Sequence, residues 1–331
     1  MDDALVVGGT RFIGRHLVAE LLAHEYDVTL FNRGNHDNPF AEDGRVDHVE
    51  GDRTDDDALE AAARTVDPDA VFDCVAYHPA DVRAATRVFE DCEAYVYVSS
   101  GAAYGREDIP KREDETPLAS CTAEQATNDS RDSYGNRKAE GDRVVFAAAD
   151  DGVNAMAVRP PIVYGPHDYT ERFAFWVDRV RRFDRIVVPG DGTNVWHRVY
   201  VEDVASALRV VAERGEPGEA YNVGDRRIVT LERMIERLAD TLETDVEVVY
   251  AGSRELAAGG IELEDYPLYR DHPHIVSTAK LAELGWESTP LSTAIDRTVA
   301  EHLESGRDGR GQGPCRDDEN RVLAALDYAD R

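Results

Sequence analysis

A tyrosine and a lysine four residues apart, Tyr134 and Lys138, form the pair in this sequence best suited to acid–base chemistry. On a helix that spacing places both side chains on one face. An ammonium beside a phenol stabilises the phenolate and lowers its pKa from about 10 toward neutrality, which makes a usable general base. Such pairs are also common on helix surfaces without any catalytic role. Lysine is rare in this chain, however, because only Lys111, Lys138 and Lys280 are lysines among the 37 Lys and Arg residues. We therefore predict that Tyr134 and Lys138 act together.

A glycine-rich turn near the start of the chain predicts a dinucleotide site. The apolar run 4–7 is typical of a buried strand, and it leads through Gly8, Gly9 and Gly14 into an amphipathic helix. In that context a pyrophosphate binds the free N–H groups at a helix N-terminus. Arg11 stands where the usual pattern has another glycine, so its side chain can project over the adenosine half of a cofactor. A glycine turn without a ligand is the alternative.

The second predicted strand, 28–31, ends in Asn32 and Arg33 rather than in the acid that binds a free ribose 2′-hydroxyl. An arginine suits a 2′-phosphate, and Arg11 and Arg33 together would form a bidentate clamp. The sequence therefore favours NADP over NAD, with a solvated loop arginine as the alternative. Asp52, after a third strand, is expected either to accept a hydrogen bond from the adenine amino group or to cap the next helix.

Hydroxyl side chains follow the fifth predicted strand, which begins at Tyr95. In an open α/β sheet, ligands lie off the carboxyl ends of the strands. Ser100 is therefore predicted to hydrogen-bond a substrate oxygen, and Ser99 either to face the cofactor or to satisfy backbone. Small Ala76, after the fourth strand, lets backbone approach the cofactor. The polar segment 106–133 is long enough to cover a substrate.

Several motifs, taken together and in their order along the chain, resemble those of an extended, atypical short-chain dehydrogenase/reductase of the NAD-dependent epimerase/dehydratase family. The Gly-Gly-x-x-x-x-Gly form of the first turn is similar to a subgroup that includes relatives of chloroplast stem-loop RNA-binding proteins. The resemblance covers roughly residues 4–305. Its motifs are the turn 8–14, Asp52, Ser100 with Tyr104-Gly105, Tyr134 with Lys138, and Arg159-Pro160 through Tyr164-Gly165-Pro166.

The resemblance implies a Rossmann fold, in which a doubly wound parallel α/β sheet of about seven strands carries a smaller C-terminal α/β substrate lobe. The cofactor domain is expected at 1–166 with a return segment at 198–224, and the substrate lobe at 167–197 and 225–305. Residues 306–331 are expected to form a flexible linker and an amphipathic helix. That helix docks either on its own body or on a second copy in a homodimer.

The same resemblance assigns roles to individual residues. Tyr134 is the expected acid/base, Lys138 binds the nicotinamide ribose, and Ser100 binds the reacting oxygen. Expected substrate residues are Ser100, Gly101, Tyr104, Arg198 and Arg270, the two arginines as contacts for a nucleotide diphosphate. Expected cofactor-binding residues are Gly8, Gly9, Thr10, Arg11, Phe12, Ile13, Gly14, Asn32, Arg33, Asp52, Arg53, Ala76, Tyr77, Ser99, Tyr134, Lys138 and Pro161.

The predicted function is hydride transfer on a nucleotide sugar by an NAD(P)-dependent epimerase or reductase. A 4,6-dehydratase resembles this chain but carries an Asp-Glu pair where Gly101 and Ala102 stand here, and neither of these residues can donate or accept a proton. Two alternatives stay open. One is an NADP-dependent reductase of a non-nucleotide carbonyl compound, and the other is an RNA-binding or regulatory protein on the same fold.

The acidic composition argues for a halophile-like surface rather than for a particular partner. The 67 acids and 37 bases give a net charge of −30, with acids in every segment. This charge argues against nucleic acid, for which 179–185 and 306–316 are the only local basic candidates. The four cysteines show no C-x-x-C spacing, so we expect reduced thiols, no metal site and a cytoplasmic location. No apolar run approaches the ~20 residues of a membrane span.

Overall fold

A computed structural model describes residues 1–329, which form two compact units. Unit 1 comprises Met1–Val163, Val199–Gly224 and Val276–Ser288. Unit 2 comprises Tyr164–Arg198, Asp225–Ile275 and the chain from Thr289 onward. The chain therefore leaves unit 1 and returns to it twice.

Unit 1 is built on a seven-stranded parallel sheet, which confirms the predicted Rossmann architecture. Across the sheet the order is β10-β6-β5-β4-β1-β2-β3. The chain thus winds outward in both directions from β1 and β4, and in such sheets ligands bind where the order reverses. The strands are β1 (Asp3–Val7), β2 (Asp27–Asn32), β3 (Val46–Glu50), β4 (Ala70–Asp73), β5 (Ala94–Val98), β6 (Ala155–Arg159) and β10 (Ala220–Asn222).

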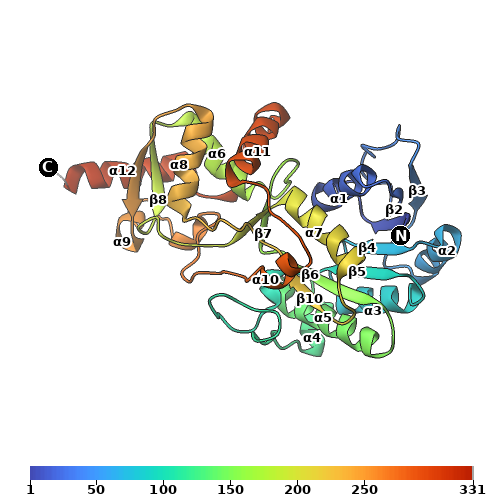
Figure 1. Cartoon of the computed structure of the whole chain (residues 1–331). Coiled ribbons are helices and arrows are strands. Elements are labelled where there is room, and N and C mark those ends of the chain that lie inside the picture. Colours follow the sequence, from blue (N-terminus) through green and yellow to red (C-terminus); the bar gives the residue numbers. More distant parts are fainter. Residues whose placement is uncertain (330–331) are drawn as a thin grey trace. The chain divides into compact units, whose positions relative to one another are not determined.

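The central strands are buried along their whole length because helices cover the sheet on both faces. Every residue of β4, β5 and β6 is buried, whereas the edge strand β3 is largely exposed. Figure 1 shows α1 and α7 on one face and α2, α3 and α5 on the other. The helices of this unit are α1 (Phe12–Ala23), α2 (Asp56–Val66), α3 (Pro79–Val88), α4 (Ala123–Thr127), α5 (Tyr134–Asp150), α7 (Val201–Arg214) and α10 (Ala279–Glu283).

The register of the sheet aligns the carboxyl ends that carry the predicted site. Val7 of β1 lies opposite Phe31 of β2 on one side and Asp73 of β4 on the other. The residues that follow these three strands therefore emerge at one edge of the sheet. This edge holds the glycine turn, Asn32 and the segment that leads to Ala76.

Unit 2 is a smaller α/β unit. Its two-stranded parallel sheet pairs β8 (Arg185–Pro189) with β11 (Glu247–Ala251). Where the chain passes between the units, β7 (Ile162–Tyr164) and β9 (Arg198–Tyr200) form a further two-stranded sheet. The helices of unit 2 are α6 (Arg172–Arg182), α8 (Leu231–Leu242), α9 (Ser253–Leu256), α11 (Leu291–Ser305) and α12 (Arg316–Ala329).

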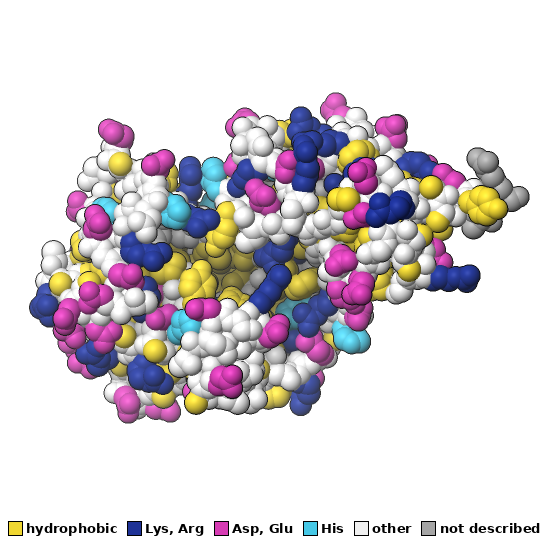
Figure 2. Space-filling view, turned by 180° about the vertical axis from the view of Figure 1, so that it is seen from behind, with side chains coloured by type: hydrophobic (Ala, Val, Ile, Leu, Met, Phe, Trp, Pro, Cys, Tyr) yellow, Lys and Arg dark blue, Asp and Glu magenta, His cyan; other side chains and the backbone are white. Residues whose placement is uncertain are grey.

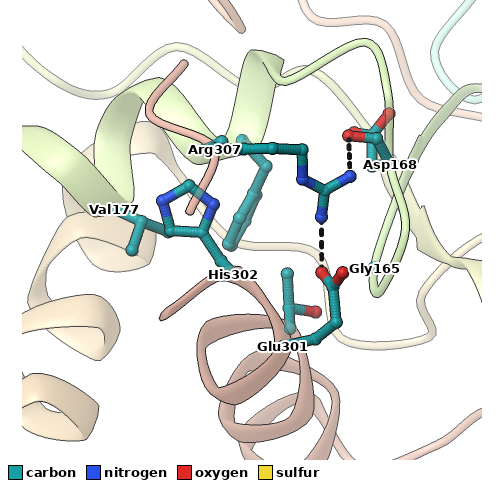
Figure 3. A pocket seen from close by; sticks show the side chains of 9 residues that line it. Gly165, Asp168, Val177, Glu301, His302 and Arg307 are labelled. Carbon is teal, nitrogen blue, oxygen red and sulfur yellow. Dashed lines mark hydrogen bonds and ion pairs between the residues drawn. The ribbon is translucent and has the colours of Figure 1, made fainter. Parts of the chain in front are cut away.

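The C-terminal segment is fastened to unit 2. Arg307 donates a hydrogen bond of 3.1 Å to the Asp168 carbonyl oxygen and forms an ion pair of 2.5 Å with Glu301 (Figure 3). Glu319 of α12 is fully buried, with one carboxylate oxygen 2.9 Å from Arg179 Nε. Residues 306–314, predicted to be flexible, are therefore held in place, and α12 docks on its own chain.

Two helix starts differ from prediction, and one strand and one helix were not predicted. The sequence pattern predicts a helix that begins at Val204 with Asp203 as its cap. Helix α7 instead begins at Val201, so Asp203 lies in its first turn, where an acid still favours the helix dipole. Asp55, not Asp52, caps α2 by accepting from the Asp57 and Ala58 N–H groups. Strand β8 and helix α11 were not predicted, although the apolar run Ile186–Val188 is a signal for a buried strand.

The acidic side chains are spread over the molecule rather than gathered on one patch. Figure 2 shows them across the visible face, interleaved with Lys and Arg. No helix among residues 1–329 is both long enough and apolar enough to cross a membrane.

Candidate active site

The glycine turn has the backbone that a pyrophosphate cradle requires. Gly8 and Gly9 have φ of 116° and 91°, a region that side chains other than hydrogen disfavour. A Cβ on Gly14 would lie 2.6 Å from the Gly9 nitrogen, so glycine is needed for α1 to approach the turn. The first turn of α1 contains no acidic residue, which leaves its positive end without a competing carboxylate. The turn therefore fits a dinucleotide phosphate.

Asn32 and Arg33, at the end of β2, make different kinds of contact. The Asn32 side chain donates to the Gly8 carbonyl oxygen at 3.0 Å and accepts from the Gly34 N–H at 2.9 Å, so it braces the glycine turn. Arg33 is 65% exposed, and its guanidinium lies 3.9 Å from the Asp52 carboxylate. Asp52 accepts hydrogen bonds from the Thr54 backbone and hydroxyl, which lower its pKa.

Arg53 lies in a buried ion pair. Its guanidinium is hydrogen-bonded to Asp73 at the end of β4 and lies 3.7 Å from Asp81. Asp73 is fully buried and also accepts from the Tyr95 hydroxyl at 3.3 Å. The structure thus places Arg53 in the interior of unit 1, where it neutralises Asp73, and its predicted cofactor contact stays a prediction. Sequence reasoning missed this pair because no local pattern links the two positions.

Lys138 is the most constrained charged group of the site. Its ammonium donates two hydrogen bonds of 2.8 Å, to the carbonyl oxygens of Ala76 and Val98, which follow β4 and end β5. The nitrogen lies 4.7 Å from the centroid of the Tyr97 ring and 5.9 Å from that of Tyr134. Burial lowers the pKa of Lys138 to about 8. Since an ammonium has three N–H groups, the two carbonyls leave one for a ligand.

Glycine brings the start of α5 against the turn that holds Ser100. A Cβ on Gly135 would lie closer than 3.0 Å to the Ala102 carbonyl oxygen, so only glycine permits this approach. Ser100 is nearly buried and accepts from the Ala102 N–H at 3.1 Å, while the Gly101 N–H donates to the Pro160 carbonyl oxygen at 2.8 Å. The structure therefore places Ser100 and Tyr134 on adjoining segments.

The structure contradicts one of the two roles predicted for Ser99. Its hydroxyl is buried, and no hydrogen-bond partner for it occurs among residues 1–329. It therefore does not satisfy neighbouring backbone, as one reading of the sequence proposed. An unpaired buried hydroxyl is costly unless a ligand or water completes it, so Ser99 fits a position beside a bound molecule. Ala76, Tyr77 and Pro161, also predicted to meet the cofactor, belong to the same unit.

A buried polar network that the sequence did not reveal supports this arrangement. Asp142 of α5 accepts from Arg159 Nε at 2.8 Å, and both side chains are almost fully buried. Arg159 also donates to the Tyr104 hydroxyl at 3.0 Å, which in turn donates to the Asn222 side chain at 2.8 Å. Tyr104, predicted to contact substrate, is thus engaged inside unit 1. The network ties α5 to the ends of β6 and β10.

Arg137 forms a second support that was not predicted. Its guanidinium donates to the carbonyl oxygens of Tyr77 at 3.2 Å and Ser130 at 3.1 Å, and also to that of Asn128. Together with Lys138, it holds two consecutive carbonyls of the segment after β4. Helix α5 therefore fixes this segment in one position.

The two arginines predicted to bind a nucleotide diphosphate both lie in unit 2. Arg198 is 5% exposed and donates to the Val229 carbonyl oxygen at 3.0 Å. Its other terminal nitrogen, Nη1, is buried and has no hydrogen-bond partner in the described chain. Burial lowers the pKa of Arg198. The Arg270 guanidinium lies 5.4 Å from the centroid of the Trp196 ring.

Residues 4–224 match the model of the NAD dependent epimerase/dehydratase family. The chain belongs to this family of enzymes. It is 27% identical over 297 residues to chloroplast stem-loop binding protein of 41 kDa b from Arabidopsis thaliana, covering 86% of this chain and 74% of that protein. It is also 27% identical over 319 residues to low-salt glycan biosynthesis protein Agl12 from Haloferax volcanii, covering 86% and 93% respectively.

Two solved structures share the fold of this chain. The dTDP-glucose 4,6-dehydratase from Bacillus anthracis, in complex with NAD, superimposes with a TM-score of 0.72 at 21% identity, covering 92% of this chain and 97% of that one. The UDP-glucose 4-epimerase from Thermotoga maritima, with UDP-glucose, gives 0.71 at 22% identity, covering 92% and 100%. The family and fold predicted from the sequence are both confirmed.

Proposed function

We propose that this chain is an NAD(P)-dependent epimerase or reductase of a nucleotide sugar, with Ser100, Tyr134 and Lys138 as its catalytic residues. One observation carries the proposal. The Lys138 ammonium is held at the carboxyl edge of the sheet by two backbone carbonyls, on the helix that also presents Tyr134. A buried cation so placed lowers the cost of forming a phenolate nearby.

The cofactor would lie along the carboxyl edge of the sheet. The Gly8–Gly14 turn and the start of α1 would hold its pyrophosphate, and the third N–H of Lys138 would bind the ribose beside the nicotinamide. When bound, the nicotinamide supplies a reversible acceptor of hydride from a carbon that bears a hydroxyl. The unpaired Ser99 hydroxyl supports a ligand at this position.

The chain's own residues would move the proton. Tyr134 takes the proton of the substrate hydroxyl as the carbonyl forms, and it returns that proton when the carbonyl is reduced again. Lys138 stabilises the phenolate before the transfer. Ser100 donates a hydrogen bond to the reacting oxygen and holds it in line with Tyr134. Return of the hydride to the opposite face of the carbonyl would give an epimer. A reductase would use only the second half of this cycle, starting from a carbonyl substrate and the reduced cofactor.

The preference for NADP rests on the end of β2. Asn32 stands where an acid would bind the free 2′-hydroxyl, and its side chain is engaged with the glycine turn. Arg33 is exposed and only distantly paired with Asp52, so its guanidinium can turn toward a 2′-phosphate. These contacts support NADP as the preferred cofactor, with NAD as the alternative.

The substrate class rests on unit 2 and on the relatives. Arg198 has a buried Nη1 without a partner in the described chain, as expected of a group that completes its hydrogen bonds on an anionic ligand. A diphosphate provides such acceptors. The name of the Haloferax volcanii relative refers to glycan biosynthesis. Gly101 and Ala102 offer no carboxyl group for elimination, which supports an epimerase or reductase over a dehydratase.

The test is turnover of a panel of nucleotide sugars by wild type, Tyr134→Phe and the control Tyr328→Phe. The control residue is 82% exposed and should not affect catalysis. We expect Tyr134→Phe to lose about 100-fold or more in kcat, the usual contribution of a general acid–base group. Wild-type turnover by Tyr134→Phe would refute the assignment. The four cysteines are free, which is compatible with the proposed location of the protein in the reducing cytoplasm.

A non-nucleotide carbonyl compound is the second candidate substrate. The observation that favours it is a relative at 30% identity over 236 residues, 2-alkyl-3-oxoalkanoate reductase from Stenotrophomonas maltophilia, with 65% of this chain covered. Adding 3-oxoalkanoates to the same panel distinguishes the two. Filter binding of an RNA stem-loop across a salt series tests the nucleic-acid alternative, because real phosphate contacts give a steep slope.

A further inference from the structure

Two arginine-rich segments that are distant in the sequence meet around one pocket of unit 2. Arg179 and Arg182 come from the last turn of α6, and Arg310 and Arg316 come from the C-terminal segment. With Phe183 they line a pocket of about 220 Å³. In a chain with a net charge of −30, a pocket walled by four guanidinium groups is an exception to the surrounding field.

The inner wall of this arginine pocket is rigid. Arg179 and Arg316 share the buried Glu319, at 2.9 Å and 3.4 Å. Arg316 also donates to the Arg185 carbonyl oxygen at 3.0 Å, and its guanidinium stacks on the Phe183 ring with 4.1 Å to the centroid. Two guanidinium groups therefore face one carboxylate, and this part of the wall keeps an excess of positive charge.

The outer wall of the arginine pocket is formed by the more exposed guanidinium groups of Arg182 and Arg310. Arg182 is 37% exposed and meets the buried Asp178 through Nε at 3.3 Å. Arg310 is 61% exposed and meets Asp308 through Nε at 2.7 Å. Both arginines meet their carboxylates through Nε, which leaves the terminal Nη groups of these accessible side chains able to contact a ligand. Even with Asp178, Glu319 and Asp308 counted, the four arginines leave the pocket positive.

Stabilisation of the helix does not account for all four charges. Arginines in the last turn of α6 favour its dipole, but Arg310 and Arg316 belong to other segments. The first half of α6 lines the pocket in Figure 3, where Arg307 lies between Asp168 and Glu301 and its charge is matched by a carboxylate. Of these two pockets, the arginine pocket is the one with an excess of positive charge.

We propose that the arginine pocket binds a phosphate-class oxyanion, held by the terminal Nη groups of Arg182 and Arg310 against the fixed charges of Arg179 and Arg316. The planar fork of a guanidinium matches two oxygens of a tetrahedral oxyanion. The partly enclosed site weakens solvent screening, so the contacts are stronger than on open surface. The ligand is either free phosphate or the phosphoryl group of a small metabolite. This site is separate from the proposed catalytic residues, all of which lie in unit 1.

The test is calorimetric titration of the full chain with inorganic phosphate, and in a second arm with ribose 5-phosphate, at ionic strength kept constant with KCl. Arg310→Gln is the main variant, because its pair with Asp308 is exposed and its loss should leave the fold intact. Arg233→Gln is the matched control, since it removes the same charge from a similarly exposed ion pair on α8. Arg33→Gln controls for phosphate bound at the cofactor turn.

We expect saturable binding by wild type, Arg233→Gln and Arg33→Gln, and about a tenfold or greater rise in Kd for Arg310→Gln, the loss of one hydrogen bond to a charged group. Binding of ribose 5-phosphate with the same dependence on Arg310 identifies a phosphoryl group as the ligand, and binding of inorganic phosphate alone identifies the free ion. No saturable binding in either arm, or equal weakening by Arg310→Gln and Arg233→Gln, would overturn the proposal. Tm in the absence of phosphate verifies that each variant is folded.

Discussion

The close approach of α5 to the Ser100 turn makes Gly135→Ala the most informative single substitution. The added Cβ would lie closer than 3.0 Å to the Ala102 carbonyl oxygen, whereas ordinary contacts fall at 3.4–4 Å. The helix start and the turn must therefore separate by about 1 Å. A displacement of that size between catalytic groups costs about 100-fold in rate. We expect kcat/KM to fall by that factor.

The stability of Gly135→Ala should change much less than its activity. Overpacking costs about 1–3 kcal/mol. Replacing glycine by alanine inside a helix returns about 1 kcal/mol. The free energy of unfolding, measured by urea denaturation, should fall by about 0–2 kcal/mol. Cofactor affinity, measured by fluorescence titration, should stay close to wild type because the Gly8–Gly14 turn is untouched.

Gly259→Ala is the matched control. Its Cβ would meet a backbone oxygen, that of Asp318, at 2.5 Å, but both residues lie in unit 2. It should lose a similar amount of stability and keep its turnover. If Gly135→Ala keeps wild-type kcat/KM, or if both variants lose activity equally, the contact between α5 and the Ser100 turn does not position the catalytic groups.

Three other perturbations test charges of unit 1. Burial lowers the pKa of Lys138 to about 8, so the free enzyme loses this proton as the pH rises through that value, and kcat/KM should fall above it. Lys138→Arg stays charged and should remove this alkaline limb while lowering activity, and an unchanged limb would contradict the role of Lys138. Asp142→Asn leaves Arg159 buried without its carboxylate and should cost about 3–5 kcal/mol of unfolding free energy in urea titrations; a loss below about 1 kcal/mol would show that the pair matters little. Arg33→Gln should raise the Kd of NADP about tenfold and leave that of NAD unchanged, and equal effects on both would argue against a 2′-phosphate contact.

Local patterns in the sequence predicted the elements that carry the site. The apolar run 4–7, the glycine turn and the following helix are all found, because strand and helix periodicities and the φ requirements of glycine are properties of a few adjacent residues. The spacing of Tyr134 and Lys138 predicted a shared helix, and both residues lie on α5.

Roles that depend on distant partners could not be predicted. The pairing of Arg53 with the buried Asp73 has no local signal in the sequence, and the predicted cofactor contact of Arg53 stays a prediction. The hydrogen bonds that join Tyr104 to Arg159 and Asn222 likewise have no local signal, and its predicted substrate contact stays a prediction. A charged or hydroxyl side chain has the same appearance in a sequence whichever distant residue it pairs with, and only the folded chain shows that partner.

The sequence by itself determined the family, the order along the chain of the strands that form the large sheet, and the candidate catalytic pair, because each depends on residue type and short spacing. The tertiary structure alone decided which charges neutralise one another, that Gly135 admits the Ser100 turn, and that α12 docks on unit 2 and brings Arg316 beside Arg179. The physical reason is that pairing of buried charges and close backbone contacts depend on distances in space. Residues far apart in the chain set those distances, and no local pattern records them.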